Sequence, residues 1–254
     1  MRFIPALLFC IVAISPLSLA APDDGLPLSL NDLKLEHMDW KFPLTDYVAD
    51  ASLAWCEVDG QDLFILDSAN TLHCLDLARG VHRWILNLDE KPTQAPGIGA
   101  NNIAVAITDR LVLAKRKNGA RYLDKPIKAL PTTSPAVTED AAYVSVYVQN
   151  RLYAVDGATG TTGWSYRFKD YIATAPRIYG TAAERFLYAA AHDGAVICLS
   201  PRPALEGAPA KPAWVFQTTG RITADLTFSG SSVLVACEDT CLYCLNRLTG
   251  GINW

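Results

Sequence analysis

Three cysteines near the end of the sequence are the residues whose types and spacing are most suggestive of metal or redox chemistry. They lie as Cys237-x-x-x-Cys241-x-x-Cys244, which superficially fits an iron–sulfur ligand set. Strand alternation places Cys241 and Cys244 on opposite faces, so a three-cysteine cluster is geometrically awkward. A Cys237–Cys241 disulfide across the intervening turn and a pair of free thiols both remain open.

Histidine chemistry is sparse. The sequence has four histidines, of which His73 and His82 fall on consecutive predicted strands and are expected to be neighbours. Two histidines without a convergent carboxylate are more often packing or surface residues than metal ligands. The sequence also lacks a nucleophile elbow, a phosphate-binding loop, a dinucleotide fingerprint and an H-E-x-x-H motif. We therefore expect no catalytic, cofactor-binding or metal site.

The composition supports a folded domain and excludes several classes of protein. The 254 residues are 50% hydrophobic and 19% charged, with a net charge of −4. An acidic chain without a basic block is a poor candidate for binding nucleic acid or anionic lipid. Sixteen Gly and fifteen Pro, spread along the chain, favour many short elements joined by turns over a coiled coil, a multi-span membrane protein or a collagen-like rod.

Residues 1–20 have the features of a secretory signal. Arg2 provides a positive start, an apolar stretch follows, and small residues precede Ala21. Pro5 and Pro16 interrupt the stretch, which is too short for a membrane anchor. The bulky Phe9 before Cys10 argues against a lipidation site. We expect a signal peptide (1–20), a tail (21–34) and one folded domain (35–254), located in the periplasm or secreted, without a transmembrane span after cleavage.

An aromatic residue recurs about every forty residues in the rest of the chain. The gaps lie between 38 and 50 residues, and a Gly precedes most of the aromatics. The recurring positions are Trp40, Trp84, Tyr122, Trp164, Trp214 and Trp254. Between them, short stretches of alternating apolar and polar residues are separated by turn residues, as in Val144–Val148, Arg151–Asp156 and Gly163–Phe168. A period of this length predicts a repeat architecture of β-strands.

The repeat predicts an all-β fold of about five four-stranded units. The units span 43–84, 85–122, 123–164, 165–214 and 215–254. A single sheet of this size cannot bury both faces, so neighbouring sheets must stack, and radial stacking gives a β-propeller. The predicted strand Leu33–Phe42 either pairs near the last unit and closes a short ring, or the ring is open. An open ring would expose apolar faces and self-associate.

These stretches resemble the PQQ-type β-propeller repeat, which is also found in BamB-like proteins. Its pattern L-Y-A-L-D-x-x-T-G-x-x-x-W is matched by Leu152–Trp164, by Leu242–Trp254 and, less completely, by Leu72–Trp84. The resemblance covers nearly all of residues 40–254. It implies a propeller fold but leaves function open, because the repeat serves both quinoprotein dehydrogenases and non-enzymatic scaffolds.

The repeated residues are expected to be structural. The polar residues Asp76, Asp156 and Asn246 and the glycines Gly80, Gly119, Gly160 and Gly250 are expected to form tight turns. Each tryptophan is expected to pack on the adjacent blade while its N–H finds a carbonyl. Cys74, Cys198 and Cys244 stand at the step of Ala154, where a small buried residue is needed.

The resulting expectation is an exported, non-catalytic scaffold that binds a protein partner in the cell envelope. The BamB resemblance implies a role in outer-membrane protein assembly. The alternatives are a propeller that binds a small molecule, such as a quinone or a sugar, and a PQQ-dependent oxidoreductase. The enzymes usually carry adjacent cysteines beside the quinone, and no two cysteines are adjacent here. We therefore expect no enzyme and no cofactor, PQQ included. Arg110, Arg151 and Asp193 follow equivalent hairpins and mark the rim at which a partner is expected.

Overall fold

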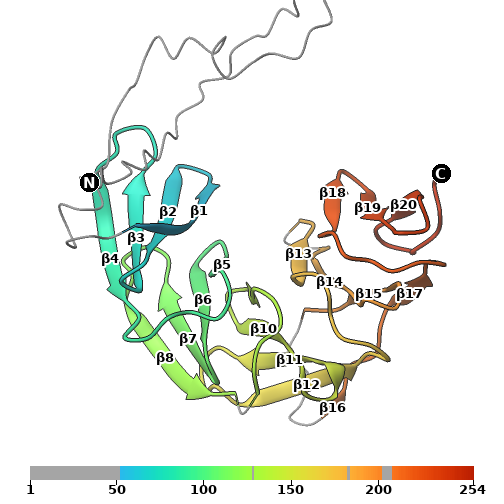
Figure 1. Ribbon diagram of the computed structural model, residues 1–254, viewed down its shortest axis with the longest axis horizontal. Helices are drawn as coiled ribbons and strands as arrows, with labels where there is room; N and C mark the ends of the chain where they lie inside the picture. Colours follow the sequence, from blue (N-terminus) through green and yellow to red (C-terminus); the bar gives the residue numbers. More distant parts are fainter. Residues whose placement is uncertain (1–51, 128, 182–183, 202–207) are drawn as a thin grey trace, which may run out of the picture. The chain divides into compact units, whose positions relative to one another are not determined.

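The computed structural model describes residues 52–127, 129–181, 184–201 and 208–254. Figure 1 shows these residues as antiparallel sheets with no α-helix among them. The predicted all-β class is confirmed. The described part of the chain contains no helix of the length and apolarity that a bilayer crossing requires. The expected leader, the strand Leu33–Phe42 and Trp40 all lie outside the described residues.

The chain divides into two compact units, Met1–Asp89 (unit 1) and Glu90–Trp254 (unit 2). Unit 1 contains one four-stranded antiparallel sheet whose strands lie in chain order. The strands are β1 (Leu53–Asp59), β2 (Asp62–Asp67), β3 (Thr71–Asp76) and β4 (His82–Asn87). Gly60 and Asn70, both at positive φ, form the first two turns. Leu63 and Ile65 of β2 and Leu75 of β3 are buried together as the core of this sheet.

Unit 2 contains four further antiparallel sheets, also in chain order. The first sheet consists of β5 (Gly97–Ile98), β6 (Asn102–Ile107), β7 (Arg110–Lys115) and β8 (Arg121–Pro126). The second consists of β9 (Ala136–Val137), β10 (Ala141–Val146), β11 (Arg151–Asp156) and β12 (Thr162–Arg167). The third consists of β13 (Arg177–Tyr179), β14 (Phe186–Ala190), β15 (Ala195–Leu199) and β17 (Trp214–Gln217). The last consists of β18 (Thr227–Ser229), β19 (Ser232–Ala236) and β20 (Leu242–Asn246).

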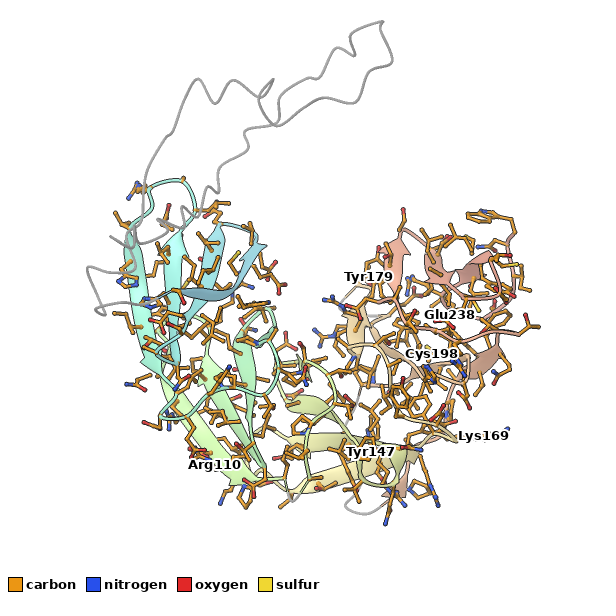
Figure 2. The ribbon with its side chains drawn as sticks, in the orientation of Figure 1. Arg110, Tyr147, Lys169, Tyr179, Cys198 and Glu238 are labelled. Atoms are coloured by element: carbon orange, nitrogen blue, oxygen red, sulfur yellow. The ribbon has the colours of Figure 1, made fainter. Side chains whose placement is uncertain are left out.

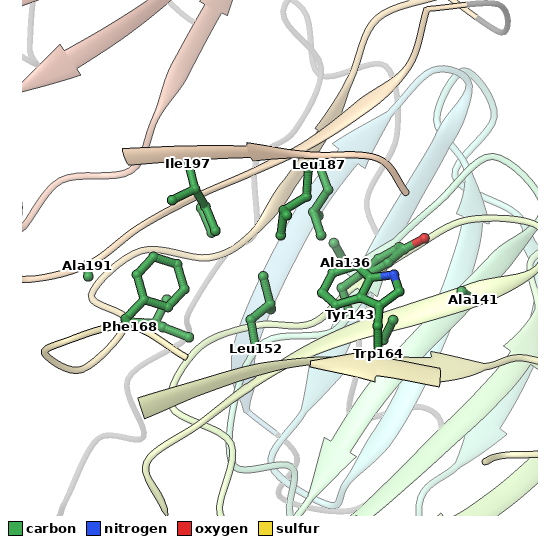
Figure 3. Close-up of a cluster of buried hydrophobic side chains, with 13 residues drawn as sticks. Ala136, Ala141, Tyr143, Leu152, Trp164, Phe168, Leu187, Ala191 and Ile197 are labelled. Atoms are coloured by element: carbon green, nitrogen blue, oxygen red, sulfur yellow. The ribbon is translucent and has the colours of Figure 1, made fainter. Parts of the chain in front are cut away.

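Consecutive sheets of unit 2 pack face to face. Apolar side chains of β6, β7 and β8 are buried with those of β10 and β11. Tyr143, Leu152 and Trp164 of the second sheet are buried against Leu187 and Ile197 of the third, as Figure 3 shows. A similar cluster joins the third sheet to the last. Within unit 2, each pair of consecutive sheets therefore buries the two faces that meet, which is how propeller blades pack.

Burial along the strands explains why some are uniformly apolar and others alternate. Every residue of β6 and of β10 is buried, and both strands lie between two neighbouring strands of their own sheet. The outer strand β4 alternates between buried and exposed side chains. The position of a strand within its sheet therefore explains its sequence pattern. Burial alternates along the outer strand, and the second strand contains a continuous apolar run.

The observed sheets differ from the expected units in three respects. The outer strands continue three residues beyond the tryptophan, because Trp84 and Trp164 lie within β4 and β12 and Trp214 begins β17. The insertion in the fourth unit adds β16 (Ala208–Pro209), which pairs in parallel with the edge strand β12. The last sheet has three strands, supplemented by an isolated bridge between Leu245 and Ile252.

Candidate functional site

The predicted turn residues share one geometry in three sheets. One side-chain oxygen of Asp76 accepts hydrogen bonds from two following backbone N–H groups, at 3.1 and 3.0 Å. Asp156 does the same at 3.0 and 2.7 Å, and Asn246 at 3.0 and 3.1 Å. These bonds close the loop between the third and fourth strands with its own side chain. The N–H and hydroxyl of Thr159 hold the pKa of Asp156 below its usual range.

The glycine at the end of each turn has a positive φ, between 64° and 73°. Its N–H donates to the carbonyl four residues earlier at 2.8 Å in all four cases. Those glycines are Gly80, Gly119, Gly160 and Gly250. At Gly250 a β-carbon would lie 2.7 Å from the Trp214 ring of the preceding sheet. Glycine therefore permits both the backbone conformation and the close approach of two sheets.

The tryptophans of β4, β12 and β17 are buried, with exposed fractions of 8%, 2% and 8%. In the third sheet, Trp214 Nε1 donates to the carbonyl of Arg247 in the next sheet at 2.9 Å. The hydroxyl of Tyr188 donates to the same carbonyl at 3.0 Å. One backbone carbonyl thus receives two donors from the neighbouring blade, which satisfies both aromatic polar groups at a buried junction.

An aromatic partner for each buried tryptophan was not foreseen from the sequence. The partners occupy the third position of the second strand, with ring centroids 6.1, 5.8 and 6.0 Å apart. The pairs are Phe64–Trp84, Tyr143–Trp164 and Tyr188–Trp214. The sequence does contain a signal for these pairs. Each aromatic partner stands ten or eleven residues before the small residue that lies between the two rings in the sheet, which is Cys74, Ala154 or Cys198.

The expected equivalence of Tyr122 with the tryptophans is wrong by one residue. Leu123, which is buried, pairs with Leu113 in the register of β7 and β8, as Trp84 pairs with Cys74. Tyr122 is 37% exposed, and the Lys115 ammonium lies 4.1 Å from its ring centroid. The assignment of Tyr122 rested on its aromatic side chain. The spacing favours Leu123, which lies eight residues after Lys115, as Trp84 lies eight residues after Asp76.

The remaining predicted positions fall at contrasting depths. Trp254 is 64% exposed, and its backbone carbonyl accepts from the N–H of Cys244 at 3.1 Å. Cys74, Cys198 and Cys244 are buried, as is Ala154. Burial raises the pKa of the Cys198 thiol to about 12, so this cysteine is a packing residue and not a nucleophile.

A carboxylate does converge on the predicted histidine pair in unit 1. His73 Nε2 lies 3.0 Å from Asp67 Oδ2, with both side chains fully buried, and His73 Nδ1 lies 2.9 Å from His82 Nε2. An ionised carboxylate only accepts, so His73 donates to Asp67 from Nε2. The sequence pattern does not reveal Asp67, because Asp67 is not the residue directly opposite His73. That cross-strand partner is Ile65, and Asp67 is the last residue of β2, two residues further along. Burial and the neighbouring His73 lower the pKa of His82.

The three predicted rim residues do follow the hairpins between second and third strands of successive sheets in unit 2. Arg110 begins β7, Arg151 begins β11, and Asp193 lies in the turn before β15. Arg110 forms ion pairs with Asp124 at 3.1 Å and Glu90 at 3.2 Å. Arg151 donates to Ser165 at 2.7 Å. Their polar groups brace the sheets to which they belong.

Exposed apolar side chains lie beside these residues. Leu130, Tyr147 and Val148 are 57%, 68% and 55% exposed. Leu130 and Tyr147 are adjacent, because the N–H of Tyr147 donates to the Leu130 carbonyl at 3.2 Å. Figure 2 shows Arg110, Tyr147 and Lys169 along one side of unit 2. Exposed large apolar residues gathered at a hairpin tip are a feature of interaction sites.

The same surface continues onto the next hairpin. Asn150 Nδ2 donates to the Lys169 carbonyl at 3.2 Å, which links the β10–β11 turn to the loop after β12. Further along that loop, Tyr171 stacks on His192, with ring centroids 4.5 Å apart. We define the rim surface as the six residues Leu130, Tyr147, Val148, Lys169, Tyr171 and His192.

The tip of the rim surface has an unusual backbone. Gln149 and Asn150 both have positive φ, 63° and 51°. Neither is a glycine, so each residue carries backbone strain. Hydrogen bonds from Arg151 Nε to Gln149 at 2.8 Å and from Asn150 to Lys169 hold them there. The strained turn presents Tyr147 and Val148 outward in a fixed position. Throughout the described ranges, no three His, Cys, Asp or Glu side chains are placed to hold a metal ion.

A family model described as outer membrane protein assembly factor BamB matches residues 68–202. The chain belongs to this family. The match spans the two complete sheets β5–β8 and β9–β12 and includes Trp84 and Trp164, and it confirms the resemblance seen in the sequence. No curated protein matches the chain.

Solved structures confirm the β-propeller fold. BamB from Moraxella catarrhalis is 20% identical with a TM-score of 0.54, over 78% of this chain and 59% of that one. A BBS1N structure in complex with ARL6DN is 15% identical with a TM-score of 0.63, over 84% and 69%. A quinohemoprotein alcohol dehydrogenase from Pseudomonas putida is 12% identical with a TM-score of 0.57, over 80% and 43%. The chain thus spans 59% of the length of that BamB structure.

Proposed function

We propose that this BamB-family chain is a non-catalytic scaffold of the cell envelope and that it binds a protein partner through the rim surface. The observation that carries the proposal is the exposed Tyr147–Val148 tip beside Leu130. Tyrosine is among the residues that contribute most to protein interfaces, and a rigid turn presents it at a low cost in conformational entropy. The family description supports an outer-membrane assembly role. The secretory signal expected at residues 1–20 supports a periplasmic or secreted location.

The rim surface suits a protein partner better than a lipid or nucleic-acid partner. Its apolar residues are interspersed with charged and polar groups, including the Lys169 ammonium and the Asp170 carboxylate. Asp170 Oδ2 lies 3.2 Å from His192 Nδ1. Mixed charge around an apolar centre is the ordinary anatomy of a protein interface. A membrane or nucleic-acid surface would favour a single-sign basic patch.

The test is capture of an outer-membrane assembly component by the full chain, using a photocrosslinking residue in place of Tyr147. Tyr122 provides a matched position, because it is also an exposed tyrosine of unit 2 but lies outside the rim surface. We expect the crosslinked partner at position 147 and none at position 122. The proposal is wrong if both positions capture the same proteins, or if neither captures an assembly component.

A second comparison uses two valines that are equally exposed. Val148 of the rim surface and Val215 of β17 are each 55% exposed. We expect Val148→Ser to weaken partner capture roughly tenfold, as for a central interface residue. Val215→Ser should leave capture unchanged. Equal effects of the two substitutions would exclude the rim surface as the binding site.

A further inference from the structure

The turn between β19 and β20 carries two cysteines, Cys237 and Cys241. Their thiols are free in the structure. The last pair in the register of the two strands is Ala236 with Leu242, so the next step along the hairpin places Cys237 opposite Cys241. The N–H of Cys237 donates to the carbonyl of Cys241 at 3.1 Å, which shows that the pairing continues to this step.

This register gives the spacing that a disulfide needs. Directly opposed residues of an antiparallel pair have Cα atoms about 4.5–5.5 Å apart. Disulfides join residues whose Cα atoms are about 4.4–6.8 Å apart. Because side chains alternate along a strand, Cys237 and Cys241 project from the same face as Val235 and Tyr243. The two sulfur atoms therefore share one side of the hairpin.

Hydrogen bonds hold the turn in this conformation. The Asp239 carboxylate accepts from the hydroxyl of Thr219 at 2.7 Å and from that of Tyr243 at 2.6 Å. It also accepts from the N–H of Cys241 at 3.0 Å. Thr240 has a φ of 69°, which is strained for a β-branched residue. The bonds to Asp239 maintain this strained turn and with it the opposition of the two cysteines.

The two cysteines are more accessible than the three buried cysteines of the described residues. Cys241 is exposed and Cys237 is half-buried, whereas Cys74, Cys198 and Cys244 are buried. Cys237 Sγ lies against Gly220, where an added β-carbon would approach it to 3.1 Å. Cys241 is thus accessible to an external reagent, and the less accessible Cys237 lies directly opposite it in the hairpin.

We propose that Cys237 and Cys241 form a dithiol site that closes to an intramolecular disulfide by exchange with a disulfide-bearing oxidant. The Cys241 thiolate attacks a sulfur of the oxidant, and one thiolate of the oxidant leaves. The Cys237 thiolate then attacks the Cys241 sulfur of the mixed disulfide and releases the second thiolate. The chain loses two electrons and two protons, and the oxidant is reduced to two thiols. This inference does not depend on the proposed partner.

The test is alkylation and mass spectrometry of the purified full chain after incubation with oxidised glutathione. The wild-type chain is expected to lose two alkylatable thiols and two hydrogens without retaining glutathione. The tryptic peptide Ile222–Arg247 contains Cys244 as well, so substitutions must identify the pair. Cys237→Ser and Cys241→Ser should each abolish the closure, and Cys241→Ser should in addition react more slowly with glutathione.

Two matched controls keep the result interpretable. Cys244→Ala places in β20 the residue that β11 has at the equivalent step, Ala154, and should leave the disulfide intact. Cys56→Ser removes the other exposed cysteine of the described residues and should also leave the disulfide intact. The proposal is overturned if oxidised wild-type chain retains all its thiols, keeps glutathione on Cys241, or links either cysteine to Cys56 or Cys244. Because the wild-type measurement stands alone, a variant that fails to fold does not rescue the proposal.

Discussion

Among single residues, Gly250 combines two constraints that are usually met separately. It has a φ of 72°, and a β-carbon there would lie 2.7 Å from the Trp214 ring. Gly230 of the same sheet has a φ of 56° but no heavy atom within 4 Å of the added carbon. A comparison of Gly250 with Gly230 therefore separates the effect of backbone strain from the effect of the close approach of two sheets.

We expect Gly250→Ala to destabilise the fold more than Gly230→Ala does. Alanine in the left-handed region costs about 1–2 kcal/mol at either site. At position 250 the displaced tryptophan adds an overpacking cost of about 1–3 kcal/mol. Denaturant unfolding of the two variants measures the difference. Equal losses of unfolding free energy would show that the contact with Trp214 relaxes freely.

His82 gives the stability of unit 1 a predicted pH dependence. Its pKa is lowered by burial and by His73, so the unfolded chain binds this proton at a higher pH than the folded chain does. Stability is therefore present above the unfolded pKa of about 6.5 and is lost as the pH falls from that value toward the lower pKa of the folded chain. We expect His82→Gln to reduce the loss of stability between about pH 7.5 and pH 5. Parallel pH profiles for wild type and variant would contradict this account.

At the scale of elements, the register of β8 decides which residue fills the position of the buried tryptophans. Leu123 is buried opposite Leu113, and Tyr122 is half-exposed. We expect Leu123→Ala to cost about 2–4 kcal/mol of unfolding free energy, because it leaves a cavity between two sheets. Tyr122→Ala should cost less than about 1 kcal/mol. A larger loss for Tyr122→Ala in urea unfolding would restore the sequence-based assignment.

The strained hairpins at 148–150 and 238–240 have a common feature: each contains a non-glycine residue at positive φ and a side chain that is hydrogen-bonded to a neighbouring element. In the first hairpin Asn150 donates to the Lys169 carbonyl of the loop after β12, and in the second Asp239 accepts from Thr219 and Tyr243. Backbone strain of this kind persists only where the surroundings determine it. The two hairpins are the ones assigned to partner binding and to disulfide formation.

At the scale of the whole molecule, the same fold serves enzymes and scaffolds, so the cofactor question needs a direct assay. The sequence has no adjacent cysteines. The described tryptophans of the outer strands are buried against aromatic partners and are not available as a stacking platform. We expect no dye reduction by the full chain with PQQ, calcium and alcohol or sugar substrates, with a quinoprotein dehydrogenase as the positive control. Retained quinone together with dye reduction would overturn the non-catalytic proposal.

The fold class could be predicted from the sequence because each blade needs the same short-range features, namely a tight turn and alternating strands. The turn needs an acceptor at Asp76, Asp156 and Asn246 and a glycine four residues later, and these requirements act within a few residues of chain. Strand alternation is equally local. Such requirements leave a periodic record, from which the all-β repeat, the number of sheets and their chain order were predicted.

Contacts between distant residues left no such record. The convergence of Asp67 on His73, the two donors on the Arg247 carbonyl and the apolar tip at Tyr147 and Val148 depend on register and on packing between sheets. A shift of one residue reverses the face of every side chain in a strand, as the assignment of Tyr122 shows. The sequence by itself determined the repeating blade and its turns, because those are set by neighbours along the chain. Only the tertiary structure decided which side chains meet across sheets and which remain exposed for a partner.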